Sequence, residues 1–257
     1  MSLSAPALTR ALPFVVALSS SLSCRAQPKE VRVAAASDLK DAFSDLGARF
    51  ERKTGTKLSF TFGSTGLLTK QLTEGAPYDL FAAASESYVD EVVKAGVCDV
   101  DTKAPYARGK LAIWTKDGGV ASLADLADPR FKRVAIANPE HAPYGRAAEQ
   151  ALKASGVWGA VSSRIVKGEN VQATLALATG GNAEAALVAY SLVVHLGAGA
   201  YVLVDAAAHD PIDQALVVCG TGPGVPGARA FAAFIASEEG QEVMRTYGFT
   251  LPPPGQP

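Results

Sequence analysis

Apolar residues follow two different spacings along the chain from Val31 onward. Residues 58–62 (Leu-Ser-Phe-Thr-Phe) alternate apolar and polar side chains, which is typical of a half-buried strand. Between residues 39 and 50 the apolar side chains recur at every third or fourth position, which predicts a helix with one apolar face. Gly55 follows this stretch, and glycine is a common residue just past the end of a helix.

Strand-like and helix-like segments alternate along most of the chain. Further strands are expected at residues 31–35, 80–84, 110–114, 134–137, 164–166, 185–188 and 214–218, and further helices at 67–72, 88–93, 144–154, 170–178 and in two segments between 231 and 247. This alternation predicts an α/β fold with a largely parallel sheet. Two such cycles, joined by connecting strands, indicate two α/β lobes with a ligand cleft between them. A single doubly wound domain would give the same pattern.

In the two-lobe interpretation, both ends of the mature chain belong to the first lobe. Residues 27–108 form the first part of lobe 1, and residues 109–215 form lobe 2. Residues 216–257 then return to lobe 1 and carry the last helices.

Residues 1–26 have the pattern of an export signal. Arg10 precedes a short apolar run at residues 11–18, and Ala26 offers a small residue at the cleavage site. The apolar run is too short to span a bilayer. In an alternative interpretation, Cys24 is the lipid-modified first residue of a lipoprotein. Simple cleavage is favoured, and the predicted location is the periplasm.

The composition argues against several classes of protein. Of the 257 residues, 48% are apolar and 19% are charged, which is typical of a folded chain. The net charge of −1 provides no basic surface of the kind that nucleic-acid binding needs. Any bound anion must therefore be held by local groups.

The cysteines and histidines form no pattern of metal ligands. The sequence has no Cys-x-x-Cys pair and its three histidines are scattered, so neither a metal site nor a cofactor is expected. After export, Cys98 and Cys219 would enter an oxidising compartment and could form a disulfide. Because nothing local brings them together, we expect two separate buried cysteines.

Small, hydroxyl-bearing or glycine residues occupy the points where strands lead into helices. These junctions are residues 35–38, 62–66, 139–145 and 167–171. Taken singly, each is explained by helix capping. Together they could form one anion site, because a helix start offers uncommitted N–H donors and the positive end of the helix dipole. Neutral donors such as Ser37, Thr65 and Tyr144 would then satisfy an oxyanion without a formal counter-charge.

A secreted serine hydrolase is an alternative for the same residues. Its nucleophile would be Ser64 or Ser37, and a histidine and a carboxylate would have to converge on that serine. Ser64 lies in Gly-x-x-Gly rather than in the Gly-x-Ser-x-Gly motif of hydrolases. A loop histidine such as His141 is more often structural. We therefore expect binding without catalysis.

The motifs at these junctions resemble those of the molybdate-binding periplasmic proteins of ABC transporters. The matching segments run in order from Val31 to about Leu251, and they are residues 34–37, 62–66, 76–81, 137–146 and 247–249. The resemblance implies a type II periplasmic-binding-protein fold. It also implies delivery of molybdate or tungstate to the membrane permease of an ABC importer. We expect the chain to act as a monomer.

The resemblance further implies which residues contact the ion. These are Ser37, Thr65 (with the adjacent Ser64 as the alternative), Tyr144 and Val171. The remaining contact is a tyrosine in some members of the family. By spacing it falls on Ala189, whereas this chain has Tyr190 one residue later, and such a shift on a strand turns the side chain to the other face.

Asp38 bears on which oxyanion is bound. A carboxylate beside the site would repel molybdate, but it could accept the proton of monohydrogen phosphate. We expect Asp38 to point to solvent in the first helical turn, where it complements the helix dipole. Phosphate or sulfate is the alternative ligand. A sensing module without an importer is a further alternative, disfavoured because no additional domain is apparent.

Overall fold

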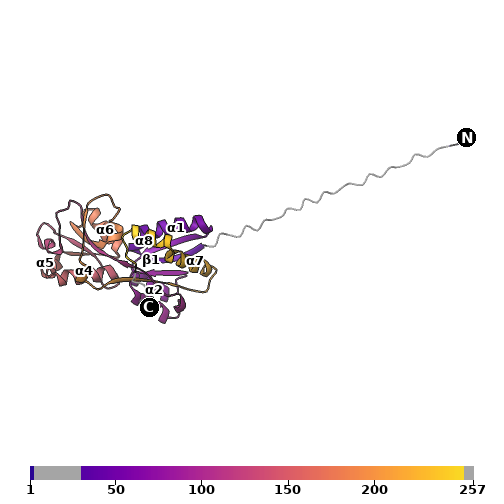
Figure 1. Cartoon of the computed structure of the whole chain (residues 1–257), viewed down its shortest axis with the longest axis horizontal. Coiled ribbons are helices and arrows are strands. Elements are labelled where there is room, and N and C mark those ends of the chain that lie inside the picture. Colours follow the sequence, from indigo (N-terminus) through magenta and orange to yellow (C-terminus); the bar gives the residue numbers. More distant parts are fainter. Residues whose placement is uncertain (3–29, 252–257) are drawn as a thin grey trace.

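The computed structural model describes residues 1–2 and 30–251. Residues 30–251 form two lobes, each built on its own five-stranded sheet (Figure 1). The predicted two-lobe α/β fold is therefore confirmed. The expectation of a largely parallel sheet is wrong, because half of the strand pairs in each sheet are antiparallel. Cys24 and most of the predicted signal segment lie outside the described residues, so both cleavage and lipid modification stay predictions.

Lobe 1 contains β1 and the helices labelled at the right of Figure 1. Its strands lie in the order β2-β1-β3-β10-β4, with bounds β1 (Glu30–Ala36), β2 (Lys57–Gly63), β3 (Leu80–Ala83), β4 (Ala104–Gly109) and β10 (Ile212–Val218). Its helices are α1 (Lys40–Thr54), α2 (Thr65–Thr73), α3 (Glu86–Lys94), α7 (Val225–Ala236) and α8 (Glu238–Thr246), with short 3-10 turns η1 (Ser37–Leu39) and η2 (Val100–Thr102). β1 runs parallel to both of its neighbours, whereas β10 runs antiparallel to β3 and β4.

Lobe 2 repeats this mixed arrangement. Its strands lie in the order β7-β6-β8-β5-β9, with bounds β5 (Leu111–Thr115), β6 (Val134–Ala137), β7 (Ile165–Gly168), β8 (Ala185–Ala189) and β9 (Ala200–Leu203). Its helices are α4 (Pro143–Ala154), α5 (Trp158–Val161) and α6 (Val171–Thr179), with short 3-10 turns η3 (Leu123–Ala127), η4 (Ser162–Arg164), η5 (Tyr190–Leu192) and η6 (Ala206–Ala208). β6 runs parallel to β7 and β8, and β5 runs antiparallel to β8 and β9.

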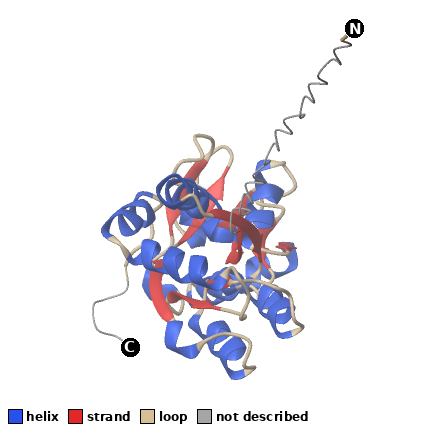
Figure 2. Ribbon diagram, turned by 90° about the vertical axis from the view of Figure 1, so that its right-hand side faces the viewer, coloured by secondary structure: helices blue, strands red, loops and turns tan. Residues whose placement is uncertain are grey.

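Alternate residues of β1 face two different layers of helices, as the pleat of a strand requires. Val33 packs in the cluster that contains Phe43 of α1 and Phe231 of α7, and these two rings lie 5.8 Å apart. The next residue, Ala34, packs in a second cluster with Leu68 of α2. Helices therefore cover both faces of the lobe 1 sheet (Figure 2), and a ligand can reach it only at the ends of its strands.

Two connections link the lobes. Lys110 separates β4 from β5, and residues 204–211 separate β9 from β10. The predicted lobe limits at 108/109 and 215/216 fall at the end of β4 and inside β10, which belongs to the lobe 1 sheet from Ile212 onward. One cluster of buried side chains contains residues of both lobes, so the lobes pack against each other along the cleft.

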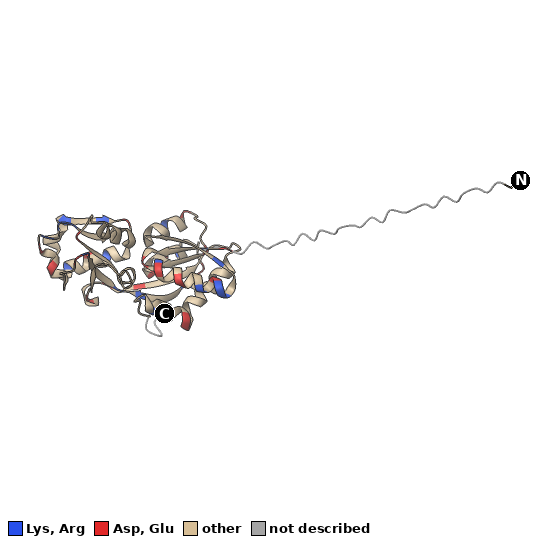
Figure 3. Cartoon of the chain, turned by 90° about the horizontal axis from the view of Figure 1, so that it is seen from above, with Lys and Arg blue, Asp and Glu red and all other residues tan. Residues whose placement is uncertain are grey.

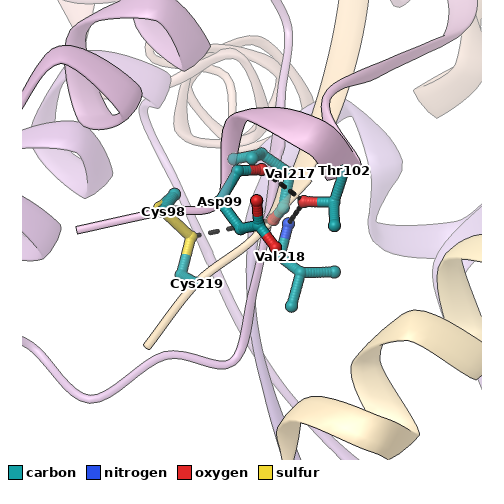
Figure 4. Close-up of a disulfide and its surroundings, with 6 residues drawn as sticks. All are labelled: Cys98, Asp99, Thr102, Val217, Val218 and Cys219. Atoms are coloured by element: carbon teal, nitrogen blue, oxygen red, sulfur yellow. Dashed lines mark hydrogen bonds between the residues drawn. A yellow bond between two sulfur atoms is a disulfide. The ribbon is translucent and has the colours of Figure 1, made fainter. Parts of the chain in front are cut away.

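A disulfide joins Cys98 and Cys219 (Figure 4). The expectation of two separate cysteines is wrong. Cys98 follows α3 and Cys219 directly follows β10, and the two residues form an isolated antiparallel bridge. The fold thus brings together two cysteines that are 121 residues apart in the sequence.

Charged residues are spread over both lobes (Figure 3). In the described part of the chain, no helix is long and apolar enough to cross a bilayer. Residues 1–2 and 30–251 also hold no group of three or more His, Cys, Asp or Glu side chains that could bind a metal ion.

Candidate functional site

The four strand-to-helix junctions meet at one small cavity between the lobes. Its lining residues are Ala36, Ser37, Asp38, Gly63, Ser64, Thr65 and Ala84 from lobe 1, and Ala142, Pro143, Tyr144, Asn170 and Val171 from lobe 2. The cavity volume open to the centre of a water molecule is about 10 Å³. No Lys or Arg is among these described lining residues.

The first junction supplies a free hydroxyl. β1 ends at Ala36, and Ser37 begins the 3-10 turn that leads into α1. Ser37 is 3% exposed, and its Oγ makes no side-chain hydrogen bond to any described residue. Its proton is therefore available to a guest in the cavity.

The second junction supplies another hydroxyl donor. Thr65 is the first residue of α2 and is buried, and its Oγ1 accepts a hydrogen bond from the backbone N–H of Ala84 at 3.2 Å. A hydroxyl that accepts in this way keeps its own proton for donation. Thr65 can therefore donate into the cavity while Ala84 holds it in place.

Ser64 occupies the N-cap position of α2, but its side chain bonds to lobe 2 instead of capping the helix. Its Oγ lies 2.7 Å from the backbone carbonyl of His141 and 2.7 Å from Nδ1 of the same residue. A carbonyl only accepts, so the single hydroxyl proton goes to it and Nδ1 must carry a proton of its own. The Ser64 hydroxyl then has no proton left for an anion.

The third junction offers backbone rather than side-chain donors. Pro143 occupies the first position of α4 and has no N–H, so Tyr144 has the first N–H of that helix. Residues at a helix start have no intrahelical acceptor for this group. The Tyr144 ring packs instead against Gly109, where an added Cβ would lie 2.0 Å from the tyrosine hydroxyl.

The fourth junction is similar. The Asn170 side chain caps α6 by accepting from Ala173 N–H at 2.9 Å. Val171, the first residue of α6, is 4% exposed and lines the cavity. Its N–H also has no intrahelical acceptor. The N-termini of α2, α4 and α6 and the turn at Ser37 thus direct their helix dipoles and uncharged hydrogen-bond donors toward the cavity.

Asp38 does not point to solvent, so that expectation is wrong. It is 1% exposed, because η1 continues β1 into the space between the lobes before the solvent-facing part of α1 begins. Its Oδ2 accepts from Nε2 of Gln214 at 2.6 Å, and Oδ1 has no hydrogen-bond partner among the described residues. Burial raises the pKa of Asp38 to about 6, although the hydrogen bond from Gln214 and the nearby Tyr144 hydroxyl act in the opposite direction.

Two tyrosines complete the polar group around Asp38. The Tyr106 hydroxyl donates to Oε1 of Gln214 at 2.7 Å, and the Tyr144 hydroxyl lies 3.5 Å from Nε2 of the same residue. Burial, followed by the charge of Asp38, raises the pKa of Tyr144 and of Tyr106 well above the usual value. Both tyrosines therefore stay neutral.

Ala189 and Tyr190 are not among the residues that line the cavity. Ala189 is the fully buried last residue of β8. The Tyr190 ring packs against Gly248, where an added Cβ would lie 2.4 Å from it, and against Tyr201, with ring centroids 5.3 Å apart. The structure therefore brings together five of the seven predicted site residues, and neither of these two is among them.

Sequence reasoning missed Ala84, which lines the cavity, and Gln214, which bonds to Asp38 in its wall. Ala84 follows a short apolar strand, and its side chain has no polar group that would suggest a role in binding. Gln214 did give a signal, because a polar residue beside the apolar run 215–218 needs a buried partner. The partner, Asp38, is 176 residues away.

A second, larger groove lies on lobe 1 beside the disulfide, and its lining contains arginines. Arg32 pairs with Asp79 at 3.2 Å, and Arg229 pairs with Asp99. Each guanidinium thus already has a carboxylate partner. This groove is the rival to the cavity as a place for an anion.

The chain is similar to known proteins over most of its length. The model of the family described as bacterial extracellular solute-binding protein matches residues 31–250. The molybdate-binding protein ModA of Azotobacter vinelandii is 35% identical over 243 residues, which cover 92% of this chain and 96% of that protein. The ModA protein of Rhodobacter capsulatus is 32% identical over 245 residues, which cover 95% and 97%. The solved structure of the Azotobacter vinelandii periplasmic molybdate-binding protein matches with a TM-score of 0.82 and 26% identity, over 86% of this chain and 99% of that one.

Proposed function

Because the chain belongs to the bacterial extracellular solute-binding proteins, and among them to the ModA molybdate-binding family, we propose that it captures molybdate or tungstate for an ABC importer. The cavity between the lobes is the proposed binding site. One chain supplies all four junctions, so the protein would work as a monomer.

The convergence of four uncharged junctions on one buried cavity carries this proposal. A buried dianion is stable only if its oxygens accept hydrogen bonds, and helix starts provide such donors with a favourable dipole. In the proposed site, the hydroxyls of Ser37 and Thr65 and the backbone N–H groups of Tyr144 and Val171 bind the ion. Ala189 and Tyr190 are outside this set.

The proposed location is the periplasm, and the proposed partner is the membrane permease of the importer. The export signal predicted within residues 1–26 supports the location. The similar molybdate-binding protein of Azotobacter vinelandii is periplasmic, which also supports this location.

Hydrolysis by Ser64 is the competing function, because a histidine does converge on this serine. The geometry disfavours it. Nδ1 of His141 must donate to Ser64, so it cannot take the serine proton, and Nε2 lies 3.1 Å from the Asn138 side-chain amide rather than bonding to a carboxylate. We therefore propose a binding protein without catalytic activity.

Calorimetric titration with molybdate, tungstate, sulfate and phosphate tests the function. We expect tight, saturable binding of molybdate or tungstate at one site per chain. Tight binding of phosphate or sulfate, with no heat from molybdate or tungstate, would still support a solute-binding protein but would contradict molybdate or tungstate as its ligand. No binding of any oxyanion, together with turnover of an activated ester, would favour the hydrolase.

A further inference from the structure

His141 connects the two lobes at the edge of the cavity. It lies in the loop between β6 and α4 of lobe 2, and its backbone carbonyl accepts from Gly66 N–H of α2 at 2.9 Å and from the Ser64 hydroxyl at 2.7 Å. Both donors belong to the start of the lobe 1 helix α2. The carbonyl of one lobe therefore occupies a helix start of the other.

The imidazole ring strengthens the same contact. Nδ1 donates to Ser64 Oγ at 2.7 Å, and Nε2 accepts from the side-chain amide of Asn138 at 3.1 Å. Both ring nitrogens are thus used in one tautomer. Asn138 belongs to the same loop of lobe 2, so it fixes the ring in the orientation that reaches lobe 1.

Gly66 allows this close approach. An added Cβ would lie 2.8 Å from the His141 carbonyl oxygen, 2.9 Å from the His141 Cβ and 2.9 Å from the Tyr88 hydroxyl. Tyr88 of α3 makes a neighbouring contact between the lobes, because its hydroxyl accepts from Nη1 of Arg146 at 2.9 Å. Any side chain at residue 66 would push the lobes apart.

We propose that His141, Ser64 and Gly66 form an interlobe latch, in which His141 is a positioning residue that holds the cleft closed over the anion. In this arrangement Ser64 acts through His141 and is not a ligand of the ion. This inference rests on the proposed function for its ligand, although the latch itself can be measured on the protein alone.

The first test is a double-mutant cycle on molybdate affinity. Ser64→Ala removes two hydrogen bonds between the lobes and should weaken binding about tenfold. His141→Ala removes one hydrogen bond between the lobes and should weaken binding about fivefold. The double variant should bind no more weakly than Ser64→Ala alone, because both changes break one contact. Dissociation should become faster, because the latch keeps the cleft closed over the bound ion.

Matched controls separate the latch from general effects. Ser44→Ala changes an exposed serine on α1 that bonds only its own helix, and His209→Ala changes a histidine that bonds its neighbour Asp210. Both should bind molybdate as the wild type does. If the losses of Ser64→Ala and His141→Ala multiply in the double variant, Ser64 contacts the ion independently and the latch is wrong.

Gly66→Ala provides a second test that removes no polar group. It should weaken molybdate binding more than tenfold without lowering the melting temperature, because alanine favours the helix. Small-angle scattering of the protein alone should show larger radii for Gly66→Ala and Ser64→Ala than for the wild type. Equal radii for all three proteins would overturn the latch even where molybdate fails to bind, whereas that failure by itself would overturn only the proposed function.

Discussion

The side-chain amide of Gln214 in β10 donates to Oδ2 of Asp38 at 2.6 Å, across 176 residues of sequence. Gln214 also accepts from Tyr106, so its orientation is fixed. The other carboxyl oxygen of Asp38 has no partner among the described residues. An acidic group is thus kept in the wall of the cavity proposed to bind an anion.

Replacing Asp38 with asparagine should stabilise the protein near neutral pH. The folded-state pKa of Asp38 is raised from 3.8 to about 6 by burial, so the native state binds the proton more tightly than the unfolded chain. Its contribution to stability is complete below about pH 4 and is lost as pH rises to about 6. The loss is about 3 kcal/mol, at 1.36 kcal/mol per pKa unit.

Urea unfolding of the wild type and Asp38→Asn from pH 4 to pH 8 measures this effect. The free energy of unfolding of the variant, relative to the wild type, should increase between pH 4 and pH 6 and then stay constant. Asp41→Asn, at an exposed position of α1, is the control. A variant that is equally destabilised at every pH would mean that Asp38 is charged and stabilising in the native state.

Asp38 should also make oxyanion affinity depend on pH. A dianion in the cavity raises the pKa of Asp38 further, because like charges oppose ionisation. Binding should therefore take up a proton, and the affinity for molybdate should fall by up to about tenfold per pH unit above pH 6. Titration of Asp38→Asn should give nearly constant affinity over the same range. A wild-type affinity that is flat from pH 6 to pH 8 would contradict the expectation.

Ser37→Ala and Thr65→Ala should each weaken molybdate binding by about 1.5–3 kcal/mol, the usual value of a hydrogen bond to a charged group. Ser37→Ala should alter the melting temperature of the protein alone very little, whereas Thr65→Ala should lower it modestly, because it leaves the buried N–H of Ala84 without its acceptor. Calorimetry and thermal unfolding on the same samples separate these two quantities. If stability falls sharply while affinity holds, these hydroxyls serve the fold and not the ion.

Tyr144→Phe should leave molybdate affinity within about threefold of the wild type, because the hydroxyl lies near Gln214 and the proposed contact is the backbone N–H. Loss of a buried polar contact should lower the free energy of unfolding by about 1 kcal/mol. Denaturant unfolding and calorimetry measure the two effects. A large loss of affinity with unchanged stability would instead mean that the Tyr144 hydroxyl binds the ion directly.

Local patterns along the chain predicted much of the fold. The strand at residues 58–62 is observed as β2, with alternating burial, and Gly55 ends α1 with a φ of 70°. The four junctions were predicted as separate segments, but only the fold brings them to one cavity. Sequence could place each donor at a helix start, because capping is a local property.

The failures involve contacts between distant residues. Asp38 was expected in solvent because its own turn gives no sign of Gln214, which reaches it from β10. Cys98 and Cys219 pair because β10 and the segment after α3 lie side by side. Ser64 has the residue type of an anion ligand, yet its hydroxyl donates to the backbone carbonyl of His141 in the other lobe.

Diffraction from crystals grown with molybdate, measured at the molybdenum absorption edge, tests the central claim most directly. We predict one strong anomalous peak in the cavity, within hydrogen-bonding reach of Ser37, Thr65 and the starts of α4 and α6, with no Lys or Arg in contact. A peak instead in the groove of Arg32 and Arg229, with the cavity empty, would contradict binding by uncharged helix starts.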